Sequence, residues 1–125
     1  MARTPVKTSS RIAAICLALP ETDELPFGGH TSPAFRVRGK MFVVISEDRT
    51  SMTLKAPPGV QAALIASDPE RFFFPKYVGS KGWVGIRLDL AAAPDWDEMA
   101  ELIYDSFSLI APKRLVAQWE ASQEP

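Results

Sequence analysis

The stretch AFRVRGKMFVVISEDRTSMTLKA, residues 34–56, decides the fold expected of this sequence. Apolar residues alternate with arginines over residues 35–38, Gly39 tolerates the positive φ of a tight turn, and residues 41–45 are continuously apolar. After the polar residues 46–50 the alternation resumes. The stretch therefore predicts three strands joined by two hairpins, with a central strand buried on both faces and a sheet that has one apolar and one basic, polar face.

The flanking sequence supplies helices and further strands. Thr4 and Pro5 are typical of a helix cap and a first helical residue, and apolar residues then recur at helical spacing. The same spacing and the proline and glycine breaks predict helices over residues 5–20, 60–68 and 96–110, a short turn or helix over 113–120, an edge strand within 21–33, and a strand over 83–88.

These elements predict an α/β (α+β) fold with a four- or five-stranded antiparallel sheet. The helix over residues 96–110 carries the strongest apolar stripe, which includes Phe107, and is expected to be the main cover of the sheet. With 125 residues and no low-complexity linker, residues 1–125 are expected to form one domain.

Composition narrows the class of protein. Hydrophobic residues make up 46% and charged residues 23%, as in ordinary soluble domains. The single cysteine excludes an internal disulfide and a multi-cysteine zinc site, so a reducing cytoplasm is the expected location. The apolar runs are too short to span a bilayer, and no signal-peptide core follows the first residues. We expect a cytoplasmic monomer with no membrane association.

The charges are distributed unevenly along the chain. The net charge is −1, but residues 33–90 contain nine Lys or Arg against five Asp or Glu, whereas residues 91–125 contain seven acids against two basic residues. A central segment of net charge +4 can orient an anionic partner, although such an asymmetry also serves solvation alone.

No residue pattern points to catalysis, a metal or a cofactor. Cys16 falls within the apolar stripe of the first helix and is expected to be a buried side chain. His30 lacks a nucleophile, an orienting carboxylate and a second ligand, so a loop role is expected. Asp97, Glu101 and Asp105 recur every four residues, which is typical of a solvated helix face. An enzyme is the least favoured class.

Several segments together resemble a known family. The segments AFRVRGKMF (34–42), SMTLKAPPG (51–59), KGWVGIRLD (81–89) and SLIAPKRLV (108–116) are similar to those of the MmcQ/YjbR family of small bacterial proteins. The resemblance covers roughly residues 12–116. It implies a twisted antiparallel sheet with helices packed mainly on one face, a frataxin-like layout, and two hairpins arranged as a double wing. The family is described as DNA-binding on the basis of this shape.

The resemblance and the charge pattern together select candidate nucleic-acid-binding residues. The family-like segments contain Arg36, Lys40, Lys55, Trp83, Arg87, Lys113 and Arg114, and the basic central segment adds Arg38, Lys76 and Lys81. Strand alternation places Arg36, Arg38, Lys55 and Arg87 on one side. Iron binding, as in frataxin, is not supported, because the first helix carries Lys7 and Arg11 and no acid.

Two binding functions stay open from the sequence. A nucleic-acid-binding module would use the basic residues on phosphates, with Trp83, Tyr77 and residues 72–74 available for stacking unless they are core. A small-anion or peptide-binding domain would use the same face on a smaller scale. A salt-steep affinity for long DNA would distinguish the two, and the most informative structural observation is whether the basic residues form one continuous surface wide enough for a duplex, or a pocket.

Overall fold

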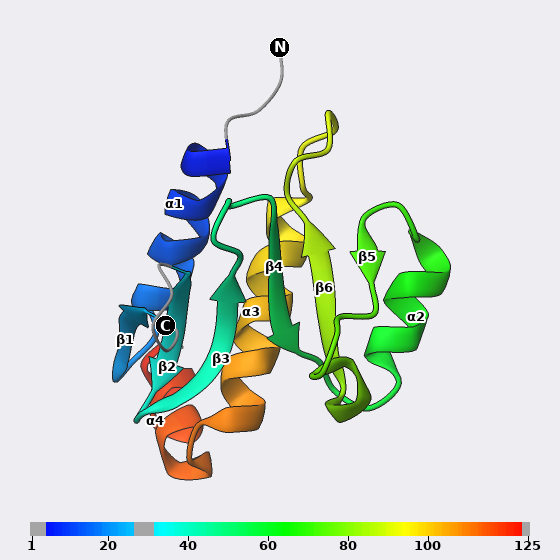
Figure 1. Ribbon diagram of the computed structural model, residues 1–125. Helices are drawn as coiled ribbons and strands as arrows, with labels where there is room; N and C mark the ends of the chain where they lie inside the picture. The colour runs from blue at the N-terminus through cyan, green and yellow to red at the C-terminus, as the bar shows by residue number, and fades with distance from the viewer. Residues whose placement is uncertain (1–4, 27–31, 124–125) are drawn as a thin grey trace.

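The computed structural model describes residues 5–26 and 32–123 (Figure 1). Within these ranges six strands form one antiparallel sheet in the order β1-β2-β3-β4-β6-β5. The strands are β1 (Thr22–Pro26), β2 (Pro33–Val37), β3 (Lys40–Ile45), β4 (Ser51–Lys55), β5 (Phe72–Phe73) and β6 (Trp83–Arg87).

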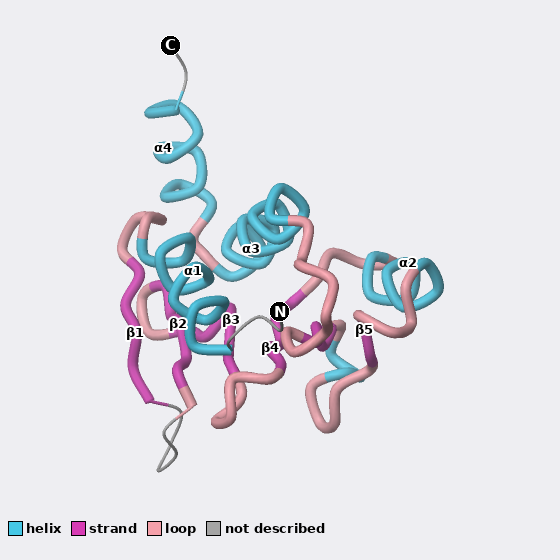
Figure 2. The backbone as a smooth tube through the Cα atoms, turned by 90° about the horizontal axis from the view of Figure 1, so that it is seen from above, coloured by secondary structure: helices cyan, strands magenta, loops and turns pink. Residues whose placement is uncertain are grey.

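The helices lie on one side of the sheet. The α-helices are α1 (Pro5–Leu17), α2 (Val60–Ser67), α3 (Trp96–Ile110) and α4 (Lys113–Gln123), and a short 3₁₀ turn, η1, spans Gly79–Lys81. Figure 2 shows α1, α3 and α4 on the same side, with α2 beside the edge strand β5. The α3 helix contacts β3 and β4, and α1 contacts β1 and β2. No helix of the described chain is long and apolar enough to cross a membrane.

The predicted architecture is confirmed, with one strand more than the four or five expected. The three strands and two hairpins of residues 34–56 are present, and helix α3 has the predicted bounds. The additional strand β5 has two residues, too few for an alternating pattern to show in the sequence. Thr4, the predicted cap of the first helix, lies outside the described residues.

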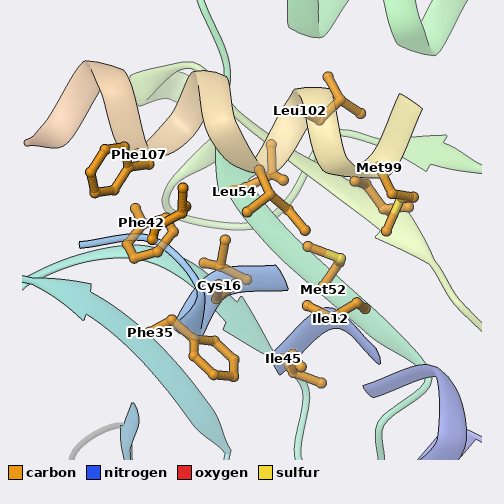
Figure 3. Close-up of a cluster of buried hydrophobic side chains, with 14 of the residues drawn as sticks. Ile12, Cys16, Phe35, Phe42, Ile45, Met52, Leu54, Met99, Leu102 and Phe107 are labelled. Atoms are coloured by element: carbon orange, nitrogen blue, oxygen red, sulfur yellow. The ribbon is translucent and has the colours of Figure 1, made fainter. Parts of the chain in front are cut away.

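The core lies between the sheet and helices α1 and α3. Phe42 and Phe107 meet edge to face with ring centroids 5.9 Å apart, and Ile12 and Cys16 of α1 complete the same cluster (Figure 3). Edge-to-face aromatic pairs contribute to stability beyond the area that they bury. Phe107 is fully buried, as its place in the apolar stripe predicts.

A β-bulge in β3 changes which side chains face the core. The register between β2 and β3 shifts at Phe35/Arg36, so Phe42 is an extra residue and both Phe42 and Val43 are buried. The hydroxyl of Ser106 on α3 donates to the Phe42 carbonyl oxygen (2.6 Å) and accepts from the Lys55 amide (3.0 Å). One buried serine thus satisfies two backbone groups beside the bulge.

The prediction that the central strand is buried on both faces is wrong. Met41 and Val44 of β3 are only half-buried, because no described helix covers the side of the sheet to which they point. That uncovered side holds the candidate site.

Candidate nucleic-acid interface

One face of the sheet, here called the open face, carries no α-helix of the described residues. Residues that pair directly across antiparallel strands point to the same side, so the strand register defines this face. Its cross-strand pairs are Arg36 with Met41, Thr53 with Gly85, Gly85 with Phe73, Lys55 with Trp83, and Ser51 with Arg87. The sequence-based placement of Arg36, Lys55, Trp83 and Arg87 away from the helices agrees with this register.

A hollow of about 550 Å³ lies on the open face. Strands β3 and β4 and the segment from β5 to β6 line it. Its lining is mainly apolar and aromatic, includes two lysines and has no carboxylate; the lining residues are Met41, Val44, Ser51, Thr53, Phe73, Pro75, Lys76, Tyr77, Val78, Lys81 and Trp83. A volume of this size is typical of ligand pockets.

Two glycines make room for aromatic rings, those of Phe73 in the wall of the hollow and of Phe74 outside its lining. The ring of Phe73 lies where a Cβ of Gly85 would be, and the ring of Phe74 lies where a Cβ of Gly79 would be. The guanidinium of Arg87 also stacks on Phe73, 4.7 Å from the ring centroid. An aromatic ring that covers a cross-strand glycine fixes both the strand pairing and the ring. The wall is therefore rigid before any ligand binds.

Hydrogen bonds fix the segment 74–82 that closes one side of the hollow. The side-chain amide of Gln61 on α2 donates to the carbonyl oxygens of Gly79 (2.8 Å) and Trp83 (2.6 Å). The ammonium of Lys55 donates to the Lys81 carbonyl oxygen at 3.2 Å. Because these contacts come from α2 and β4, the segment is tied to the elements on both sides of it.

The predicted arginines already have partners within the protein. Arg36 donates to the Leu25 carbonyl oxygen (3.4 Å), and Arg87 donates to that of Glu70 (2.8 Å). Arg38 forms two hydrogen bonds to the Glu21 carboxylate, at 2.6 and 3.1 Å. These bonds hold the pKa of Glu21 below its ordinary value and raise that of Arg38.

Arg38 does not continue the strand alternation expected of it. It forms a two-residue turn with Gly39, and both residues have positive φ (47° and 83°). Such turns match the twist of the flanking strands and leave their side chains at the hairpin end. The expectation that Arg38 shares one side with Arg36 is therefore corrected.

Three further candidate residues lie away from the hollow. Lys40 pairs with the buried Val37 and so follows the strand phase of the helix-covered side. Lys113 and Arg114 begin α4, which lies on the helix-covered side of the sheet (Figure 2). The structure brings Lys76, Lys81 and Trp83 together at the hollow and separates Lys40, Lys113 and Arg114 from them.

The aromatic run of residues 72–74 changes from core to surface along its length. Phe72 is 3% exposed and packs in the core, Phe73 is half-buried in the wall of the hollow, and Phe74 is 60% exposed. The sequence left open whether this run is core or surface. Because side chains alternate along β5 and the chain turns after it, the run is partly core and partly surface.

The other titratable groups fit structural roles. Cys16 is fully buried, as predicted, and burial, with a smaller effect of Glu24, raises the pKa of its thiol. Burial, and then the charge of Glu101, raises the pKa of Asp105 above its ordinary value of 3.8. The described residues contain no group of three His, Cys, Asp or Glu arranged to hold a metal. His30 lies outside the described residues.

The sequence analysis identified the charged residues of the hollow but not the residues that determine its shape. Gln61, Gly79 and Gly85 were not singled out, although they hold the wall and the closing segment. Three phenylalanines in a row, followed by a glycine in the next turn and another on the next strand, are the signal that was available. The cross-strand register needed to pair them is not visible in the sequence.

Comparison with known proteins identifies the family. The family model YjbR matches residues 17–109. The crystal structure of Deinococcus radiodurans protein DR2400, described with the domain DUF419, is similar with a TM-score of 0.71 and 21% identity, over 95% of this chain and 89% of that chain. The search of curated proteins found no match. Since the family model covers most of the sequence, this chain belongs to the YjbR family.

Proposed function

We propose that this protein binds nucleic acid, weakly and without strong sequence preference, through the open face of its sheet. The observation that carries the proposal is the hollow, whose lining combines Lys76 and Lys81 with aromatic side chains and has no carboxylate. Neither ammonium has a hydrogen-bond or ion-pair partner among the described residues. Phosphates bind to unpaired cations and bases stack on aromatic rings, so a nucleic acid can use both kinds of group.

The distribution of charge over the molecule supports the same face. Helix α3 carries Asp97, Glu98, Glu101 and Asp105, and it packs on the opposite side of the sheet from the hollow. An anionic chain is therefore repelled from α3 and attracted to the lysines of the open face. This polarity orients the encounter without specifying a sequence.

The number of available cations limits the affinity. Lys76 and Lys81 line the hollow, and Lys55 and Arg36, each of which already donates to one backbone carbonyl oxygen, lie on the same face, so at most about four phosphate contacts are available. Four contacts give a slope of log affinity against log salt of about −3 to −4. We expect a dissociation constant of ~10⁻⁴ to 10⁻⁶ M at physiological salt, as for non-specific binding.

Fluorescence anisotropy of labelled oligonucleotides, measured over a range of salt concentrations, tests the proposal. The double variant Lys76→Ala/Lys81→Ala should weaken binding to unrelated sequences alike and make the salt slope shallower by about one to two. The matched control Lys113→Ala/Arg114→Ala removes two exposed cations from the helix side and should leave affinity unchanged. An equal loss in both variants, or no binding at ~100 μM protein at low salt, contradicts the proposal.

The hollow also favours a second candidate, a small anionic ligand or a peptide with an apolar part. Its volume is that of a ligand pocket, and its lysines would hold the anionic group. Its lining contains no His, Cys or carboxylate, so we propose binding without catalysis. Affinity that does not increase from a mononucleotide to an oligonucleotide, and that varies little with salt, would favour this candidate.

A further inference from the structure

The exposed rings around the hollow differ in whether their faces are free. Phe73 lies against Gly85 and beneath the Arg87 guanidinium, so its ring already stacks on groups of the protein. Tyr77 is 92% exposed, although it lines the same hollow. Trp83 is half-buried, with its indole on the open face. Tyr77 and Trp83 are the rings that remain available to a ligand.

The backbone at Tyr77 is strained. Its φ is +66°, and the Val78 amide donates to the Lys76 carbonyl oxygen (2.7 Å), so a three-residue turn closes around Tyr77. A positive φ at a bulky residue is strained and persists where the surroundings impose it. The Tyr77 ring buries too little area to offset that strain. Strain held at an exposed ring beside a cavity is typical of a binding site.

The segment that carries Tyr77 is fixed rather than free. The Gly79 amide donates to the Pro75 carbonyl oxygen (3.0 Å), and the Trp83 amide donates to that of Val78 (3.3 Å). Together with the Gln61 bonds, these contacts hold Tyr77 at the rim. Because the backbone is already fixed, stacking on a planar group would order only the side chain of Tyr77.

We infer that the hollow binds unpaired bases, so that the nucleic acid bound by this face is single-stranded. This inference rests on the proposed function and names its substrate class. A base would stack on Tyr77 and Trp83, its edge would reach the hydroxyls of Ser51 and Thr53, and the neighbouring phosphates would meet Lys76 and Lys81. All six residues line the one hollow.

A duplex fits this face poorly. Paired bases present their edges in the grooves, and their ring faces are stacked on one another, so Tyr77 and Trp83 would gain nothing from a duplex. The arginines that could contact a duplex backbone already have partners in the protein. Arg38 donates to the Glu21 carboxylate, and Arg87 donates to the Glu70 carbonyl oxygen. The two free lysines lie around a hollow of ligand size and do not form a broad basic surface.

The test compares a labelled oligothymidylate of about 12 nucleotides with a duplex of the same length. The single strand should bind the wild-type protein at least about fivefold more tightly, which is the smallest gain expected from stacking one base. Tyr77→Ala should weaken single-strand binding roughly five- to one-hundredfold without changing the salt slope. Tyr77→Phe keeps the ring and should bind like the wild type.

The outcomes separate this inference from the proposed function. Equal affinity for both oligonucleotides, with Tyr77→Ala unchanged but Lys76→Ala/Lys81→Ala weakened, overturns the single-strand inference and leaves nucleic-acid binding in place. No binding of either oligonucleotide at low salt overturns both. Because Tyr77 is exposed and its positive φ is equally strained with Ala or Phe, its variants should melt close to the wild-type temperature, so a loss of binding reports the ring and not the fold.

Discussion

The two faces of the sheet are built from the same strands but under opposite constraints. The helix-covered face buries Phe42, Leu54 and Phe107 completely, whereas the open face leaves Met41, Val44 and Trp83 only half-buried. On the covered side the side chains are held by packing against α1 and α3. On the open side the Phe73 ring packs on Gly85, and Gln61 donates hydrogen bonds to the backbone of Gly79 and Trp83. One face supplies stability and the other presents a preformed hollow.

The first prediction contrasts deletions on the two faces. Phe107→Ala should lower the free energy of unfolding by ~3–5 kcal/mol, because it leaves a cavity between α3 and β3. Val44→Ala, on the open face, should lower it by less than about 1.5 kcal/mol, because its site collapses against solvent. Urea unfolding measures both. A loss below ~1 kcal/mol for Phe107→Ala would contradict the packing described.

A second prediction concerns the serine that bridges the bulge. Ser106→Ala leaves the Phe42 carbonyl and the Lys55 amide without their partner, and each buried unpaired group costs ~1–3 kcal/mol. We expect a loss of at least about 2 kcal/mol in denaturant unfolding. The control Ser67→Ala removes an exposed hydroxyl from the end of α2 and should change stability by less than about 0.5 kcal/mol. Equal effects would show that the bridge adds no stability.

The third prediction affects the open face alone. Gly85→Ala places a methyl group where the Phe73 ring lies, and the ring must move out of the wall of the hollow. Overpacking should cost ~1–3 kcal/mol and weaken oligonucleotide binding. The double variant Phe73→Ala/Gly85→Ala should be more stable than the two single effects predict when added, since the clash is gone. Additive effects would mean that the two residues do not interact.

The smallest effect predicted is a pH-dependent one on the covered side. Glu101 and Asp105 are like charges four residues apart on α3, and burial and that charge raise the Asp105 pKa above 3.8. A raised pKa means that ionised Asp105 destabilises the fold, so the contribution of Asp105 to stability is most favourable below pH 3.8 and falls as the pH rises through its folded-state pKa.

Asp105→Asn should therefore raise stability at pH 7 by ~0.2–0.5 kcal/mol and have no such effect below the ordinary pKa. Asp97→Asn, in the first turn of α3, should have the opposite sign, because a carboxylate there interacts favourably with the helix dipole. Thermal melts at pH 3 and pH 7 measure both variants. Stabilisation by Asp105→Asn that is equal at the two pH values would contradict the assignment.

Most of the covered face could be predicted from the sequence. The periodicity of residues 34–56 predicted β2, β3 and β4, and the apolar stripe of residues 96–110 predicted α3 and the burial of Phe107, because both patterns are local. The bulge at Phe42 and the two-residue strand β5 were missed. Both depend on pairing between strands, which leaves no periodic signal.

The open face could be predicted only in part. Alternation correctly placed Arg36, Lys55, Trp83 and Arg87 away from the helices. It could not show that Arg38 bonds to Glu21, or that α4, which begins at Lys113, lies on the helix-covered side. Ion pairs and helix placement depend on residues that are distant in the sequence. The hollow itself follows from the packing of Phe73 on Gly85.

The central claim, that the two faces divide stability and binding between them, is tested most directly by NMR. Amide chemical shifts of ¹⁵N-labelled protein should be followed during titration with oligothymidylate. We predict shifts in strands β3, β4 and β6 and in segment 74–82, with those of Tyr77 and Lys81 among the largest and those of α3 and α4 unchanged. Shifts concentrated on α3, or on Lys113 and Arg114, would contradict the account.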